Sequence, residues 1–125
     1  MKRPPRERLR RRAQAWATRL RVRPVQIRVQ DMTRKWGSCS PGGRITLAMD
    51  LARQPAAFQE FVIVHELLHL RFRNHGRLFE AVLRTYLAGN RFVQRDFRPG
   101  TRFEPGRPPR SAKLRHPRAF PGVFG

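Results

Sequence analysis

Three of the four histidines in the chain lie within eleven consecutive residues, and two of them frame a glutamate. The run His65-Glu66-Leu67-Leu68-His69 places two imidazoles four positions apart. On a helix such side chains share one face, with Cβ atoms about 5–6 Å apart, so both can reach one metal ion. Glu66, next to the first ligand, can hold a water at that metal. The predicted chemistry is hydrolysis by a metal-activated water, with Glu66 as general base.

The alternative interpretation is a core helix that happens to carry two histidines. Apolar residues cover nearly every face of the segment between Phe58 and Phe72, which is typical of a buried helix. A buried imidazole or carboxylate is costly, and metal coordination removes that cost, so we favour metal binding. A purely structural site would need a fourth protein ligand and would not need Glu66. An open position suits a catalytic metal.

The third metal ligand is predicted to be His75, six residues beyond His69. A continuous helix would turn His75 away from the metal, so the helix must end first. Asn74 tolerates the left-handed conformation that ends helices, and Gly76 follows. Glu80, on the next predicted helix, is the alternative ligand, or it orients a ligand from outside the metal shell. Imidazole ligands favour zinc, and we expect one Zn²⁺ per chain.

The elements around this segment predict an α+β domain. In order they are an amphipathic N-terminal helix over about 6–22, strands at 25–29, 33–39 and 44–49, a buried helix over 55–73 and a last helix over 76–88. The turn residues Ser40-Pro41-Gly42-Gly43 join the second and third strands in a hairpin. We expect the three strands to form a small antiparallel sheet.

The charge lies mostly in the flanks of the chain. The 125 residues include 28 basic and 8 acidic ones, for a formal net charge of +20. Residues 1–23 hold ten basic residues and one acid, and residues 98–125 hold seven and one. The length predicts a single domain, over 1–97, followed by a basic, Pro- and Gly-rich, disordered tail at 98–125. Non-specific binding of nucleic acid through the basic flanks is a further prediction.

Other classes of protein are excluded by composition. The sequence contains no run of about 18 apolar residues, so it predicts no membrane span. The single cysteine, Cys39, cannot form an internal disulfide. We expect a cytoplasmic protein with no membrane partner that acts as a monomer.

Several motifs follow one another in a specific order within residues 13–93. They are Trp36-Gly37-Ser38-Cys39-Ser40, Gly43–Leu47, Val64–Leu70, Asn74-His75-Gly76 and Phe79. Together they resemble the YgjP-like metallopeptidases, relatives of the SprT-like zinc proteases. The resemblance implies a minimal zincin fold, zinc at His65, His69 and His75, and Glu66 as catalytic base. The family usually has Trp where this chain has Phe79, Ser where it has Gly76, and Asn where it has Ala48.

The substrate-binding candidates come from two places. They are Trp36, Gly37 and Ser38 in the second strand, and Arg77 and Tyr86 on the last helix. A zincin holds its peptide as an added strand along a sheet edge, and Gly37 would let a backbone approach closely. Trp36 and Cys39 are more typical of the core, although Cys39 could also be an inhibitory fourth ligand. Arg77 or Tyr86 could stabilise the oxyanion, and Tyr86 also fits the apolar stripe of its helix.

Two other functions are compatible with these residues. The activated water could attack a phosphoryl group held by arginines, in a nucleotide or phosphoester hydrolase. A single metal without a carboxylate-rich pair is unusual for that chemistry. The protein could also be a nucleic-acid-associated protein recruited by its basic arms, as SprT-like relatives include DNA-linked proteases. We predict a zinc metallopeptidase with a protein or peptide substrate.

Overall fold

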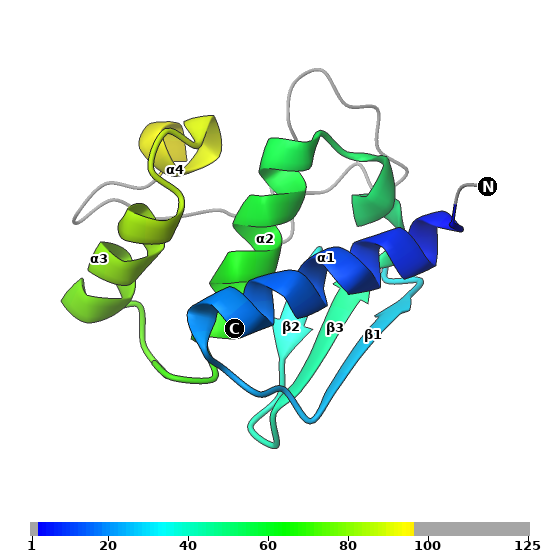
Figure 1. Ribbon diagram of the computed structural model, residues 1–125, viewed down its shortest axis with the longest axis horizontal. Helices are drawn as coiled ribbons and strands as arrows, with labels where there is room; N and C mark the ends of the chain where they lie inside the picture. Colours follow the sequence, from blue (N-terminus) through cyan, green and yellow to red (C-terminus); the bar gives the residue numbers. More distant parts are fainter. Residues whose placement is uncertain (1–2, 97–125) are drawn as a thin grey trace.

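The computed structural model describes residues 3–96, in which one helix precedes a small sheet and further helices follow it (Figure 1). The elements are α1 (Pro5–Leu20), β1 (Gln26–Gln30), β2 (Gly37–Cys39), β3 (Arg44–Ala48), the short 3-10 helix η1 (Met49–Arg53), α2 (Ala56–Leu68), α3 (Arg77–Tyr86) and α4 (Arg91–Asp96). The α+β prediction is confirmed, and η1 and α4 are additions to it. The tail predicted at 98–125 lies outside the described residues and stays a prediction.

The three strands form a mixed sheet in the order β1-β3-β2. The hairpin is as predicted: β2 runs antiparallel to β3, with Gly37 opposite Leu47 and Cys39 opposite Ile45. The N–H of Gly43 donates to the carbonyl of Ser40 at 3.0 Å and closes the turn. The expectation that all three strands are antiparallel was wrong, because β1 pairs with β3 in parallel. Strand β2 occupies one edge of β3. The chain between β1 and β3 is long enough to cross over, so β1 can pair in parallel with the other edge of β3.

The N-terminal helix covers the core with the stripe that its spacing predicts. The buried side chains are Leu9, Ala13, Trp16, Ala17 and Leu20. This face packs against α2, η1 and β1, while arginines occupy the exposed faces. Pro5 begins the helix, where its missing N–H is not needed. No helix among residues 3–96 has the length and apolar character that crossing a bilayer requires.

The centre of the molecule is α2, which is buried on all sides over its last two turns. Every residue from Phe61 to Leu68 is buried. Trp36 has no exposed surface and meets Phe58 edge to face, with ring centroids 5.3 Å apart. The helix ends at Leu68, five residues before the predicted end. α2 packs against β2 and β3, so the sheet and this helix together position the chemically active residues.

Candidate metal centre

Three histidine side chains converge at the C-terminal end of α2. His65 lies on the helix, His69 caps its end, and His75 lies in the loop before α3. One candidate ligand nitrogen from each lies within 4.8 Å of the others. The Nε2 atoms of His69 and His75 are 2.9 Å apart. Two nitrogens on one tetrahedral zinc, bound at about 2.0–2.1 Å, lie roughly 3.3 Å apart, so the cluster has the size of a metal site.

The turn after α2 is what brings His75 back to the helix. The N–H groups of Leu70 and Arg71 donate three residues back, to Leu67 and Leu68, at 3.0 and 2.9 Å. These tighter turns end the α-helix. The expectation that Asn74 adopts the left-handed conformation was wrong. Among residues 3–96, Arg21 is the one non-glycine residue with positive φ.

A backbone carbonyl in the same turn fixes the orientation of His69. Its Nδ1–H donates to the carbonyl oxygen of Phe72 at 3.0 Å. In a neutral imidazole this leaves the lone pair on Nε2, which faces the cluster. Burial lowers the pKa of all three histidines, and furthest for His65, where the other two add to the effect. The cluster therefore presents neutral imidazoles at neutral pH, the form that binds metal.

Glu66 lies beside this cluster with its carboxylate fully buried. Neither carboxylate oxygen accepts a hydrogen bond from any residue that the structure describes. Oε2 lies 3.6 Å from Nδ1 of His65. Burial raises the pKa of Glu66 well above its usual range, against the opposing charge of Lys35. A buried carboxylate without hydrogen bonds next to three imidazoles fits a metal ion and its water, which would satisfy these groups.

The comparisons with known proteins agree with this geometry. A family model described as "YgjP-like, metallopeptidase domain" matches residues 1–98. The chain belongs to the YgjP-like metallopeptidase family. The resemblance of its motifs is thereby confirmed, and the family implies a metal ion and a peptide substrate. No curated protein matches the chain.

Two solved structures share the fold of this YgjP-like chain. One is the metallopeptidase zymogen jannalysin of Methanocaldococcus jannaschii, at 24% identity and a TM-score of 0.59, covering 66% of this chain and 84% of that one. The other is the metallopeptidase zymogen abylysin of Pyrococcus abyssi, at 24% identity and a TM-score of 0.53, covering 68% and 82%. The small zincin-like fold predicted from the sequence is confirmed.

The strand β2 of this metallopeptidase lies directly against the glutamate. A Cβ added at Gly37 would lie 3.1 Å from Cγ of Glu66 and 3.2 Å from Cγ1 of Val62. The close approach expected at this glycine is therefore an approach to α2. Ser38 is half-buried on the same strand. Burial, and then the charge of Glu66, raises the pKa of the half-buried Cys39 thiol to about 11, so the thiol is protonated.

The sequence analysis named Phe79 only as a position of the family motif and missed its contact with the histidines. This buried ring contacts all three imidazoles, with centroid distances of 5.1 Å to His65, 5.0 Å to His69 and 4.8 Å to His75. It fills the space between α2 and α3 and holds the rings in place. Its position four residues after the third histidine, in the first turn of a helix, was the available signal.

The other candidates on α3 lie further out. Glu80 is outside the histidine cluster, and its charge raises the pKa of His75 against the effect of burial. Arg77 is exposed at the start of the helix. Tyr86 lies two turns beyond Phe79 and meets Trp16 edge to face, at a centroid distance of 6.5 Å. The structure does not bring Tyr86 to the cluster.

Proposed function

We propose that this YgjP-like protein is a zinc metallopeptidase in which His65, His69 and His75 hold one Zn²⁺ per chain. Glu66 is the general base. The observation that carries the proposal is the buried carboxylate of Glu66 beside three converging imidazoles. The protein or peptide substrate follows from the family.

Zinc, when bound, supplies a Lewis acid that polarises the scissile carbonyl and makes water more acidic. Glu66 accepts the proton of the attacking water at its carboxylate and later gives it to the leaving amine. Its two oxygens accept no hydrogen bond from the described residues, which leaves the carboxylate available for this proton. His69 keeps its orientation through its bond to the Phe72 carbonyl.

The substrate backbone is proposed to lie along β2. This strand is at the edge of the sheet and carries Gly37 beside Glu66. An extended peptide can add to such an edge through main-chain hydrogen bonds. Trp36 supports the strand from the core and Ser38 lies on it. Of the two candidates for stabilising the oxyanion, Arg77 begins α3 two residues after His75 and is the one we retain.

Metal analysis and a cleavage assay test this function together. Wild type purified without chelators should carry about one zinc per chain, as should Glu66→Gln, whereas His69→Ala and His75→Ala should lose it. Hydrolysis of an unstructured protein should be absent from all three variants. Glu80→Gln is the matched control and should keep both zinc and activity.

Two results would contradict the proposal. One is wild-type protein that binds no metal, and the other is a Glu66→Gln variant that hydrolyses protein at the wild-type rate. A parallel assay with nucleoside triphosphates should show no hydrolysis, which separates peptidase from phosphoester hydrolase. Binding of nucleic acid, the domain boundary at 97, the monomeric state and the cytoplasmic location stay predictions.

A further inference from the structure

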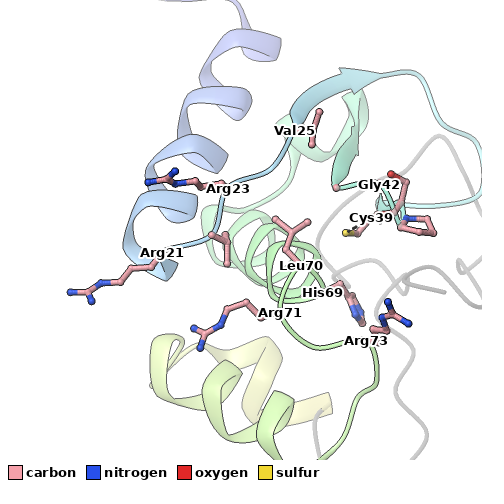
Figure 2. A pocket seen from close by; sticks show the side chains of 13 residues that line it. Arg21, Arg23, Val25, Cys39, Gly42, His69, Leu70, Arg71 and Arg73 are labelled. Carbon is pink, nitrogen blue, oxygen red and sulfur yellow. Dashed lines mark hydrogen bonds between the residues drawn. The ribbon is translucent and has the colours of Figure 1, made fainter.

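A groove of about 780 Å³ opens beside the candidate metal centre (Figure 2). Its lining comes from three segments that are distant in sequence: 21–25 between α1 and β1, 39–43 at the hairpin turn, and 69–73 after α2. His69 belongs to this lining, so the groove is continuous with the histidine cluster. Its volume is in the range of pockets that hold small ligands.

The groove is basic and carries no acidic side chain. Its four charged residues are Arg21, Arg23, Arg71 and Arg73. All four are exposed, and none forms an ion pair with a carboxylate of residues 3–93, whose side chains the structure describes. Arg73 and His69 both line the groove, and in Figure 2 the other three arginines extend on the opposite side of Leu70 from His69. The four arginines therefore place positive charge around the margin of the groove.

The walls of the groove are held by defined backbone contacts. The N–H of Val25 donates to the carbonyl of Gly43 at 2.8 Å, which ties the strand entry to the hairpin turn. Gly43 has a φ of +93°, and a Cβ there would lie 3.2 Å from Val25 Cγ2. Arg21 ends α1 in the left-handed conformation, and its N–H reaches the carbonyls of Ala17 and Thr18. These contacts fix the backbone from which the side chains of Arg21 and Arg23 extend.

The groove also lies along the path proposed for the substrate. A peptide added to β2 passes Gly37, beside Glu66, and then Cys39, which lines the groove. At about 3.3 Å per residue, the groove takes substrate residues roughly two to four positions from the scissile bond. Val25, which is 69% exposed, and Leu70 give it an apolar floor between the charged side chains.

We propose that this groove selects peptides that carry acidic residues a few positions to one side of the scissile bond. The assignment rests on the proposed peptidase function. Guanidinium groups bind carboxylates through paired, charge-assisted hydrogen bonds, and the floor can take the methylenes of a glutamate. The lining contains no Phe, Tyr or Trp on which a base could stack, and its one imidazole, His69, belongs to the histidine cluster, so a peptide is favoured over single-stranded nucleic acid.

Peptide binding to the full-length chain tests the assignment without requiring catalysis. The probes are dye-labelled ten-residue peptides with several glutamates and their glutamine counterparts. They are titrated by fluorescence anisotropy into Zn²⁺-loaded and metal-free Glu66→Gln protein. Near 0.15 M salt the glutamate peptide should bind about tenfold tighter, from several partly screened pairs.

Two double variants, made in the same background, remove the groove charge. Arg71→Gln/Arg73→Gln and Arg21→Asn/Arg23→Gln should each reduce the preference to about threefold or less, and asparagine tolerates the left-handed position. Arg6→Gln/Arg10→Gln removes the same charge from exposed positions more than ten residues before the groove and should keep the full preference. In the active enzyme, the groove variants should raise KM for the glutamate peptide and leave kcat unchanged.

Each outcome decides the assignment. Equal binding of the two peptides overturns it, as does an equal loss of preference in the Arg6/Arg10 control. A ten-nucleotide single strand that loses affinity in Arg71→Gln/Arg73→Gln, while the peptide preference stays, assigns the groove to nucleic acid and also overturns it. If wild type cleaves no peptide but the arginine-dependent preference persists, the peptidase proposal fails and the acidic-ligand groove stands.

Discussion

At the scale of single residues, burial of the Glu66 carboxylate lowers the stability of the metal-free fold. Its carboxylate is buried, and its pKa is raised chiefly by that burial. The unfolded chain ionises this group near its ordinary value of about 4.3, whereas the folded chain resists ionisation. Folding therefore becomes less favourable as the pH rises above that value. A group this costly in the metal-free state is typical of a functional site.

The variant Glu66→Gln should accordingly be more stable than wild type when no metal is present. We expect its Tm at pH 7 to be higher by at least about 4 °C, the shift given by about 1 kcal/mol in a domain of this size. Below about pH 4 both states hold the proton and the difference should vanish. Thermal unfolding followed by circular dichroism in chelator measures it, and a difference independent of pH would contradict the argument.

The contact between Gly37 and Glu66 makes a second prediction. Gly37→Ala forces Cγ of Glu66 to move, because the new Cβ would lie 3.1 Å away. A misplacement of about 1 Å at a catalytic group costs on the order of 10²-fold, so the smaller shift that this contact forces should lower kcat by roughly tenfold or less while zinc content is unchanged. Gly76→Ala is the matched control, since a Cβ there meets nothing within 4 Å. Equal activity of both variants would show that the contact is unimportant.

The residue types and spacing were enough to predict the histidine cluster and its glutamate. A helical face and a turn determine those distances locally. The contact of Phe79 with all three imidazoles could not be predicted, because it depends on how α3 packs against α2. The same holds for the arginine groove, whose segments meet only in the folded chain.

At the scale of elements, the sequence predicted the helices and strands better than their pairing. Period-two alternation and the Pro-Gly-Gly turn give the strands and the hairpin. The parallel pairing of β1 with β3 was missed because it follows from the packing of α1 and α2, which no local pattern encodes. The helix α4 was missed because its start depends on a cap made across the fold.

That cap is Asn90, which joins α4 to α2. Its Oδ1 accepts the N–H of Phe92, and its Nδ2 donates to the carbonyl of Ala57, both at 2.9 Å. Asn90→Ala should lower the free energy of unfolding by about 1–3 kcal/mol, since it removes both bonds at a buried position. Asn90→Asp keeps the acceptor and loses the donor, so its free energy of unfolding should lie between those of wild type and Asn90→Ala. Urea unfolding measures these free energies, and an Asn90→Ala variant as stable as wild type would exclude the capping role.

At the scale of the whole molecule, charge and chemistry occupy different parts of the chain. Of the formal charge of +20, +9 lies in residues 1–23 and +6 in residues 98–125, and the helix that carries His65 and Glu66 holds no Lys or Arg. The four arginines of the groove are basic residues that lie next to the histidine cluster, because they share its lining with His69. The net charge thus bears on which substrates approach, and the histidine cluster on what happens to them.

The proposed zinc also links elements, because His65 belongs to α2 and His75 precedes α3. An ion that binds the folded state at 100 times its Kd contributes about 2.7 kcal/mol, which should raise Tm by roughly 10 °C or more. Titration of Zn²⁺ into chelator-treated wild type, followed by calorimetry, measures the gain. His69→Ala is the control and should show little change. A similar gain in that variant would place the zinc elsewhere.

Burial of the three ligands follows their order along the chain. His65 is buried, His69 is half-buried and His75 is exposed. Because His75 is the most exposed of the three ligands, we expect it to detach first when metal leaves. The exchange rate of the metal is thus controlled by the outermost imidazole and the short turn that carries it, whereas all three ligands share in the affinity. Slow or fast metal turnover can consequently be tuned at this loop without touching the buried helix.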